Sequence, residues 1–572
     1  MNTIYDTDVL IIGSEGAGTR AAIAAAKQGA SVLIVTKGRI GKSGATLMAA
    51  ADISVDGASI FDVLGLSVGN SKDSPQIFLE DILRAGKFIN NLPLAEKIVE
   101  AAPIRVKEMM AWGMKIRGVM QCPGHRYPRG VSTTGREIVR VLNKQLRSVD
   151  LTVKEYTFVI DLLTTGNSVI GAIGLDLRTG EFAVFRARAV ILATGGGSML
   201  YPIQTGAVEL TGDGYAMALR AGARLVDFEM IQFMPLCLIG PLPYRGSYFP
   251  FSLVAESVDS LDGWLLNRRG ERFMRRWDPE LLEKTTRDKL SAAIGYEVKH
   301  GRGTPNGGIY LSLAHLPRNI LDDFANRTLK LHLKKNWRFE GFDFSFIRDI
   351  LSRGEALEVG PACHFFVGGI DVDLDCQTSL PGLFAAGEVV GGLHGANRLS
   401  GNACMEILVA GEMAGRKAAE YAKQANGSVV DQSQIDEIVT EAQAPLERKG
   451  SHTTFMVKKK IQERAWGKVG PIRDGQELEG ALASLKELTH EHHQSGLTCK
   501  DRVYNPEWIQ VLQNRNLLIL LEAIIQCALA REESRGVHYR IDWPQQIEKW
   551  RCNLVVELTA SGLEIYPRNP IE

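Results

Sequence analysis

The feature that most constrains this sequence is a glycine-rich turn between an apolar strand and a small-residue helix. Residues 8–12 form an apolar run, the segment GSEGAG (13–18) follows, and residues 19–27 form an alanine-rich stretch that Gly29 ends. A second apolar strand is expected over residues 31–35. A turn of this kind lets backbone N–H groups and a helix N-terminus approach a pyrophosphate closely. The segment therefore predicts a β–α–β unit of an α/β fold.

Two departures from the usual pattern leave the purpose of this unit open. Glu15 stands at the second glycine position of a GxGxxG motif, where a carboxylate should repel phosphate unless it turns away. The second strand ends Val35-Thr36-Lys37, without the acidic residue that commonly binds a ribose. On these residues alone, dinucleotide binding and a plain α/β unit both remain open.

Two distant segments favour a cofactor site. Residues 182–194 become the apolar strand VILA and run into TGGG, and residues 382–388 (GLFAAGE) form another strand that ends in a glycine and a carboxylate. The segment HGANRL (394–399) and a helix expected over about 402–422 follow. Three glycine-rich strand ends, separated by long stretches of chain, are typical of one long cofactor that lies across a discontinuous domain.

Composition excludes several classes of protein. The 572 residues carry 66 basic and 66 acidic side chains, so a basic nucleic-acid surface is not expected. No basic N-terminal region precedes a long apolar stretch, and no run approaches the roughly 18 apolar residues of a membrane span. None of the 8 cysteines has CxxC spacing, which argues against an iron–sulfur cluster or structural zinc in this chain. We expect a cytoplasmic protein in a reducing compartment, without direct membrane insertion.

Further motifs place the chain in a family by resemblance. They are IIGSEGAG (11–18), KSGATLMAA (42–50), GHRYPRG (124–130), ILATGGG (191–197), TGDGYAMALRAGA (211–223), EMIQFMP (229–235), LLNRRGERFM (265–274), CHFFVGGI (363–370), GLFAAGE (382–388), LHGANRLSGNA (393–403) and ALAREESRGVHYRIDWP (528–544). With these motifs the chain resembles the flavoprotein subunits of the succinate dehydrogenase and fumarate reductase family. That family also includes L-aspartate oxidase and the adenylylsulfate reductase flavoprotein.

The resemblance implies a fold and its division into domains. It predicts an α/β protein with a glutathione-reductase-like FAD-binding domain, an inserted α+β capping domain and a C-terminal helical domain. The boundaries that we assign are 1–229 and 352–428 for the discontinuous FAD-binding domain, 230–351 for the capping domain and 429–572 for the helical domain.

The resemblance also implies which residues bind FAD. Those expected to hold the pyrophosphate, the adenosine, the ribityl chain and the flavin are Gly13, Ser14, Gly16, Ala17, Gly18, Thr36, Lys37, Lys42, Ser43, Gly44, Ala45, Thr46, Ala193, Thr194, Gly195, Asp213, Glu388, Arg398, Asn402 and Ala403. Membrane-bound members have a histidine bonded to the flavin where this chain has Gly44. Glycine offers no nucleophile, so we expect the FAD to be non-covalent.

The resemblance breaks at the dicarboxylate site. His364, Arg398 and Glu256 match residues that the family uses to bind substrate or relay its proton. The family's HPT motif reads Met234-Pro235-Leu236 here, and its TExxRGEGG motif reads AESVDSLDG (255–263). By this alignment Asp259 replaces the arginine that we take as the family's proton donor. An acidic group there should repel a carboxylate, so we expect a substrate other than succinate or fumarate.

The expected pocket is wider and more apolar than a dicarboxylate needs. Met234, Leu236, Trp264 and either Tyr244 or Tyr248 are the side chains that would line it. Such a pocket suits a larger acid with one anionic group, or a sulfur-containing acceptor. A misalignment that brings Arg245 into the pocket, and so restores a dicarboxylate site, remains open.

Three smaller features have alternative interpretations. Arg129 contacts either the flavin region or a partner chain, and Cys363 is either a redox-active or a buried structural thiol. The histidines at 490, 492 and 493 form either a solvated helix face or a metal patch, and we expect no metal site.

Taken together, the sequence predicts an FAD-dependent oxidoreductase subunit with His364, Arg398, Glu256, Asp259 and Met234 at its catalytic site. Because no cysteine cluster relays single electrons in this chain, we expect an iron–sulfur partner subunit that could also hold the chain at the inner face of a membrane. The alternatives are a genuine fumarate reductase or succinate dehydrogenase flavoprotein, a self-contained oxidase, and a flavin relay or scaffold within a larger redox complex.

Overall fold

The structure is a computed structural model that describes residues 3–122, 124–247, 261–328, 345–425, 427, 429–449 and 452–571. Its centre is a seven-stranded sheet with the order β6-β2-β1-β9-β8-β7, to which β16 adds by pairing with β9. These strands are β1 (Thr3–Ile12), β2 (Val32–Val35), β6 (Thr152–Lys154), β7 (Thr157–Thr165), β8 (Ser168–Asp176), β9 (Glu181–Leu192) and β16 (Leu383–Ala385). The expected β–α–β unit is confirmed, because β1 and β2 are parallel and flank α1 (Gly16–Lys27).

The three glycine-rich strand ends belong to adjacent strands of this sheet. β9 is parallel to both β1 and β16, so Ile12 pairs with Leu192 and Leu192 pairs with Ala385. The carboxyl ends of these strands therefore meet at one edge of the sheet, where α/β folds bind ligands.

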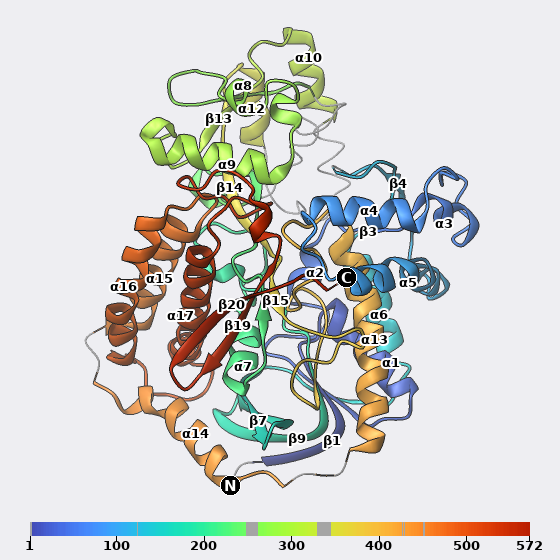
Figure 1. Cartoon of the computed structure of the whole chain (residues 1–572), viewed down its shortest axis with the longest axis vertical. Coiled ribbons are helices and arrows are strands. Elements are labelled where there is room, and N and C mark those ends of the chain that lie inside the picture. Colours follow the sequence, from blue (N-terminus) through green and yellow to red (C-terminus); the bar gives the residue numbers. More distant parts are fainter. Residues whose placement is uncertain are drawn as a thin grey trace.

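Two helices with small residues pack closely beside this edge. α13 (Asn402–Gln424) lies against α1, and a Cβ at Gly411 or Gly415 would stand 2.7 Å from Ala17 O or 2.1 Å from Ala21 O. Figure 1 shows the two helices side by side on one flank of the sheet. The glycines hold α13 near the first glycine-rich turn, although the two segments are far apart in sequence.

The other elements of this part of the molecule surround the sheet. They are α2 (Ala45–Met48), β3 (Asp52–Ser54), α3 (Gly57–Asp62), α4 (Pro75–Ala85), α5 (Leu92–Ala111), β4 (Gly118–Met120), β5 (Gly130–Ser132), α6 (Gly135–Leu146) and α7 (Asp213–Ala221).

A separate sheet with its own apolar core lies above the central sheet in Figure 1. Its order is β11-β14-β13-β12, from β11 (Ile231–Leu238), β14 (Leu357–Phe366), β13 (Ile309–Ser312) and β12 (Trp264–Leu266). The helices α8 (Met274–Trp277), α9 (Arg287–Glu297), α10 (Arg318–Asp323) and α12 (Ser345–Ser352) accompany it. β14 lies beyond the boundary assigned at residue 351, yet it pairs with β11 and β13.

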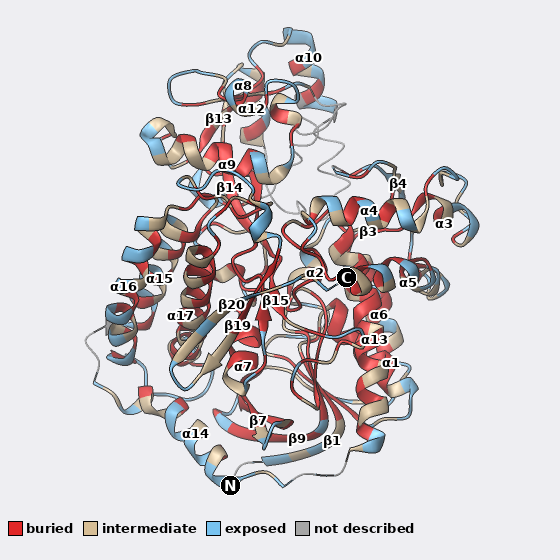
Figure 2. Cartoon of the chain, in the orientation of Figure 1, coloured by how far each residue is buried: buried red, intermediate tan, exposed pale blue. Residues whose placement is uncertain are grey.

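The C-terminal region is helical, with a final hairpin. Its helices are α14 (Gln432–Glu447), α15 (Thr454–Val469), α16 (Gly475–His493) and α17 (Pro506–Ala530). The hairpin of β19 (Asn553–Thr559) and β20 (Gly562–Arg568) joins β10 (Leu225–Val226) and β15 (Gly369–Ile370) in a four-stranded sheet. In Figure 2, α17 is buried along most of its length. Among the described helices, none combines the length and the apolar character that a membrane crossing requires.

Candidate functional site

One cavity of about 1020 Å³ lies where the three strand ends meet, and we call it the central cavity. Its walls include residues 12–14 after β1, 193–195 after β9 and 386–388 after β16. Residues 43–46 and 48–52 line one side, and residues 281 and 284–287, just before and at the start of α9, line another. The cavity therefore joins the glycine-rich turns to the base of the upper sheet, as one long cofactor beside a substrate would require.

The first turn brings backbone into close contact. Gly13 has a φ of +110°, and a Cβ there would lie 2.1 Å from Ala193 O. A Cβ at Gly18 would lie equally close, 2.1 Å, to Gly13 O. Only glycine permits this approach of strand and helix, which leaves the cavity wall at Gly13 without side chains.

Most of the residues predicted to bind FAD line the central cavity. These are Gly13, Ser14, Ala17, Thr36, Lys37, Ser43, Gly44, Ala45, Thr46, Ala193, Thr194, Gly195, Asp213, Glu388, Arg398 and Ala403. Four others, Gly16, Gly18, Lys42 and Asn402, are not part of its walls. Gly16 N donates instead to Thr46 Oγ1 at 3.2 Å, and Lys42 is exposed on the surface. Contact with the cofactor remains a prediction for each of these residues.

Hydrogen bonds fix the end of the cavity beside β2. Ser14 Oγ donates to Thr36 Oγ1 at 3.0 Å. Lys37 Nζ lies 2.6 Å from Asp213 Oδ2 and 2.5 Å from Thr211 Oγ1. The charge of Lys37 is therefore paired inside the protein.

Several polar atoms on the cavity wall have no partner within the described structure. They are Thr194 Oγ1, Glu15 Oε1 and Arg398 Nε, all buried. A buried polar atom without a partner costs free energy, so such atoms in a cavity wall indicate a polar ligand. Together with the bare backbone at Gly13 and the size of the cavity, they fit FAD.

Glu388 is an acid of the cavity wall that the backbone holds in place. Phe366 N donates to its Oε1 at 3.0 Å, and burial raises its pKa to about 7. A Cβ at Gly196 would lie 2.1 Å from the same oxygen. Gly196 therefore makes room for this carboxyl group.

The opposite end of the cavity brings together three residues predicted to be catalytic: Met234, His364 and Arg398. Met234 on β11 pairs with Ala362 on β14, two residues before His364. Thr205 Oγ1 lies 2.7 Å from His364 Nδ1, which fixes the imidazole ring.

Arg398 is held from two sides. Its Nη2 donates to Gln232 Oε1 at 3.0 Å, and the guanidinium lies 4.5 Å from the centre of the Phe365 ring. Burial, and next the nearby positive charge of Arg287, lower the pKa of Arg398 to about 10. An anion between the two guanidinium groups would relieve their repulsion.

Arg287 is a cavity residue that the sequence analysis missed. It begins α9 and lines the cavity together with Thr285 and Thr286. The available signal was the segment TTRDKLSAA (285–293), in which an arginine stands in the first turn of a helix. A cation is unfavourable at that end of the helix dipole, which suggests a functional reason for its presence.

The expectation of a wide apolar pocket is wrong for three of its residues. Leu236 is fully buried in the core of the upper region, Trp264 stacks on His315 at 4.2 Å, and Tyr244 packs on Phe346 at 4.6 Å. None of the three is part of the cavity walls, whereas Met234 is. Leu236 follows Met234 by two residues, and in a regular strand both side chains would lie on one face. The pairing of β11 with β14 shifts register between Met234 and Cys237, so the strand is not regular there.

The remaining residues of the altered motif have different outcomes. Arg245 is exposed and donates through Nη2 to Asn306 O at 2.7 Å, so this structure does not bring it into the cavity. Tyr248, Ala255, Glu256 and Asp259 lie outside the described residues.

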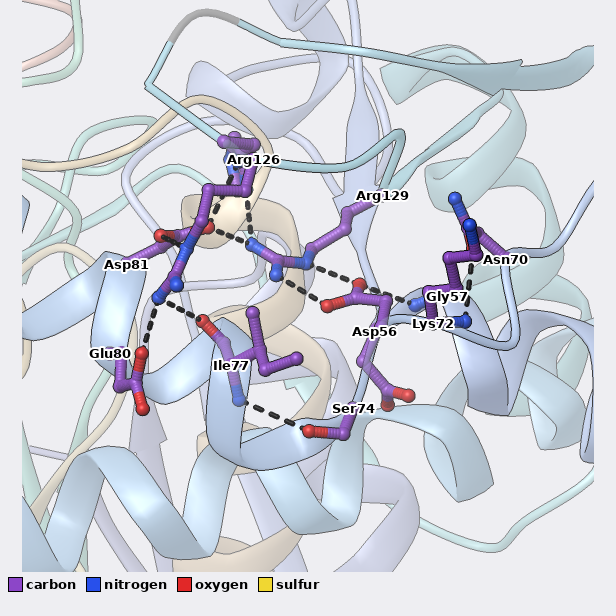
Figure 3. A network of polar contacts seen from close by, with 12 residues as sticks. Asp56, Gly57, Asn70, Lys72, Ser74, Ile77, Glu80, Asp81, Arg126 and Arg129 are labelled. Carbon is purple, nitrogen blue, oxygen red and sulfur yellow. Dashed lines mark hydrogen bonds and ion pairs between the residues drawn. The ribbon is translucent and has the colours of Figure 1, made fainter.

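Arg129 lies between two buried acids (Figure 3). Its Nε and Nη2 donate to the carboxylate of Asp73 at 2.7 and 2.6 Å, and Nη1 donates to Asp81 at 2.5 Å. The side chain is fully buried and is not part of the cavity walls. It therefore ties the loop around residue 73 to α4, rather than reaching a cofactor or the surface.

Neither Cys363 nor the histidines near residue 490 form a functional site in the described structure. Cys363 is fully buried, and burial raises the pKa of its thiol well above the usual value. His492 is buried while His490 and His493 are exposed. Within the part of the chain that the structure describes, no group of three or more His, Cys, Asp or Glu residues is arranged to hold a metal ion.

Comparison with known proteins supports the same picture. A family described as "FAD binding domain" matches residues 8–404, and one described as "Fumarate reductase flavoprotein C-term" matches residues 458–566. The chain is 34% identical to a fumarate reductase (CoM/CoB) subunit of Methanothermobacter marburgensis, over 97% of both chains. It is 31% identical to "L-aspartate oxidase" of Yersinia pestis, over 95% of this chain and 97% of the relative. A structure of Mycobacterium smegmatis Sdh1 in complex with UQ1 superimposes with a TM-score of 0.87 at 33% identity, over 99% of this chain and 94% of the other.

Proposed function

This chain belongs to the family of FAD-dependent flavoproteins that contains fumarate reductases, succinate dehydrogenases and L-aspartate oxidase, and on that premise we propose a reaction for it. It exchanges a hydride and a proton with a small carboxylic acid, and exchanges electrons with a separate iron–sulfur protein. The observation that carries this proposal is the pair of cationic groups, Arg398 and Arg287, in the wall of the central cavity.

In this proposal each residue of the cavity has its own role. Arg398 binds the substrate carboxylate, and His364, oriented by Thr205, donates a second hydrogen bond to it. Arg287 holds the proton that is transferred at the substrate carbon, since positioned proton transfer is the step a flavin cannot perform. FAD, when bound, would supply the hydride chemistry.

We propose an acid other than fumarate as the preferred substrate. Met234, an apolar side chain, occupies the wall near His364 and Arg398, where the family has a polar HPT motif. A substrate with one carboxylate at Arg398 and an apolar remainder near Met234 would match both the cationic and the apolar part of this wall.

Fumarate or succinate itself is the second candidate, and a specific observation favours it. Arg287, Thr285 and Thr286 add polar and cationic groups to the cavity wall, and they offer a second carboxylate partners that the sequence analysis had not counted. The relative from Methanothermobacter marburgensis that is 34% identical is named a fumarate reductase.

The iron–sulfur partner is proposed from the electron count. A flavin carries two electrons, and iron–sulfur clusters pass them singly. This chain has no CxxC spacing for such a cluster, and the relative from Methanothermobacter marburgensis is named as one subunit of a larger enzyme. A partner chain would then carry the clusters.

Oxidation of a reduced dye by the purified holoprotein tests the proposal with fumarate, crotonate and cinnamate as acceptors. We expect turnover with a monocarboxylate, loss of it in Arg398→Gln, and no loss in the exposed control Arg245→Gln. Fumarate as the best acceptor would select the second candidate. If no acid is turned over and none perturbs the flavin spectrum, the proposal fails in favour of an electron-relay role.

A further inference from the structure

Glu15 occupies an unusual place in the central cavity. It precedes α1 in the glycine-rich turn, but its side chain makes no capping hydrogen bond to that helix. Leu47 N, in α2, donates to Glu15 Oε2 at 3.2 Å instead. Oε1 is buried without a partner in the described structure, and Glu15 lines the cavity. One carboxylate oxygen is therefore bound by protein, and the other is left for a ligand.

The backbone around Glu15 holds the carboxylate in this position. A Cβ at Gly44 would lie 2.2 Å from Glu15 Cγ and 2.4 Å from Glu15 Cδ, and Gly44 has a φ of +94°. Gly16 N donates to Thr46 Oγ1 at 3.2 Å, which ties the turn to α2. Glu15 thus fills space that only a glycine at 44 leaves open.

The charges around Glu15 do not stabilise its ionised form. Burial, with a smaller contribution from the negative charge of Glu209, raises the pKa of Glu15 to about 7, although hydrogen bonds from Leu47 and Thr46 act to lower it. Lys37, on the cavity wall, is paired with Asp213, and Lys42 is exposed. From α2, the side chain of Thr46 and the backbone of Leu47 face the carboxyl group, and neither carries a charge.

We propose that Glu15 contacts FAD in its protonated form, so that binding of the cofactor is coupled to uptake of one proton by this side chain. The ionised carboxylate of the free protein takes a proton from solvent. The resulting Oε1–H donates a hydrogen bond to an acceptor atom of FAD, and Oε2 keeps its bond from Leu47 N.

The reason is the charge of the cofactor. The pyrophosphate of FAD carries two negative charges, and Glu15 stands in the glycine-rich turn that is expected to bind it. A carboxylate within a few ångströms of a phosphate in a partly dry site is repelled strongly, whereas a neutral carboxyl group is an additional donor. Protonation converts the unfavourable glutamate of this turn into a ligand.

The same cavity holds other acids that could take up protons. Glu388 and Asp52 line it, and burial raises their pKa values to about 7 and about 6. The test must therefore compare proton uptake between variants rather than count it in one protein.

Calorimetry supplies that comparison. The full-length chain, freed of flavin, is titrated with FAD at pH 8 in buffers of different ionisation enthalpy, which gives the number of protons bound. We expect Glu15→Gln to take up close to one proton fewer than the wild type, and Glu479→Gln, the same change at an exposed position outside the cavity walls, to match the wild type. Equal proton uptake by Glu15→Gln and the wild type would overturn the proposal.

Two measurements on the holoprotein keep the test independent of how the variant folds. Flavin release, followed by fluorescence, should show a wild-type Kd that rises up to about tenfold per pH unit above pH 7, relative to Glu15→Gln. Infrared difference spectra of wild-type protein with and without FAD should show a protonated carboxyl band that Glu15→Gln lacks. A constant ratio of the two Kd values from pH 6 to 9, or no such band in the wild type, would contradict it.

Discussion

Asn397 Nδ2 donates to Asp288 Oδ1 at 3.2 Å, and each of these residues is the direct neighbour of a cavity arginine. Asn397 precedes Arg398 in the HGANRL segment, and Asp288 follows Arg287 at the start of α9. One hydrogen bond therefore connects the two segments that carry the positive charge of the cavity. We expect this bond to help set the separation of the two guanidinium groups.

Loss of this connection should weaken substrate binding more than it affects the cofactor. In Asp288→Ala we expect KM for the acid substrate to rise by about 5–10-fold, because one hydrogen bond contributes about 1 kcal/mol. FAD content should be unchanged, as it should be in a surface control, Asp322→Ala. A KM equal to that of the wild type would show that the two segments are positioned independently.

Arg287 should affect the chemical step. Removal of a positioned proton donor costs roughly 10²–10⁴ in rate, so Arg287→Gln should lower kcat by that factor with a small change in KM. Its absorption spectrum should remain that of a loaded flavoprotein. If kcat stays within a factor of three of the wild type, the proton comes from another group.

The flavin should be released by acid. Gly44 has no side chain that could form a covalent bond, so trichloroacetic acid precipitation should leave all the FAD in the supernatant. Yellow colour or flavin fluorescence in the washed pellet would refute non-covalent binding.

Fumarate should be a poor substrate if the altered motif matters. We expect wild-type turnover with fumarate well below the range of about 1–10³ per second that is ordinary for enzymes. Asp259→Arg should raise it, because the substitution restores a cation at a position that the alignment assigns to the active site. Ordinary wild-type turnover would show that Arg287 and the threonines beside it replace the lost groups.

His492 should make the protein sensitive to acid. Burial, and then the charges of His493, Arg448 and Arg515, lower its pKa to about 3. Between pH 6.5 and 3 the unfolded chain binds a proton that the native state does not, so the free energy of unfolding falls as the pH falls through this window. The loss is about 1.4 kcal/mol per pH unit at most.

In His492→Gln this source of instability is removed. The acid unfolding midpoint, followed by circular dichroism, should shift to lower pH than in the wild type, whereas the exposed control His490→Gln should not shift. Identical midpoints for His492→Gln and the wild type would show that the native state takes up the proton without cost.

The sequence predicted the parts of the site that backbone geometry requires. Gly13 and the glycines of the TGGG segment after Ala193 occur because the backbone packs closely there, and such glycine clusters can be recognised in a sequence. Arg287 was missed because its role depends on α9 packing against β11, where Ser291 Oγ donates to Phe233 O at 3.1 Å. No local pattern reveals that contact, which joins residues 58 apart in the chain.

The pocket prediction failed for a related reason. Leu236 was placed in the pocket because it stands at the last position of the family's HPT motif, but in the structure it packs in the core of the upper sheet. The helical C-terminal region was expected, but its hairpin β19–β20 was not, because β19 pairs with β10, over 300 residues earlier in the chain.

The contact between Glu15 and Gly44 makes the two positions epistatic. A side chain at 44 displaces the carboxylate, since even its Cβ would lie 2.2 Å from Glu15 Cγ. A histidine able to bond to the flavin could therefore not be introduced at 44 by a single substitution, and an evolutionary path between a covalent and a non-covalent cofactor has to pass through a chain with a smaller residue at 15. In sequences of this family, a glutamate at the position of Glu15 should therefore occur together with a glycine at the position of Gly44.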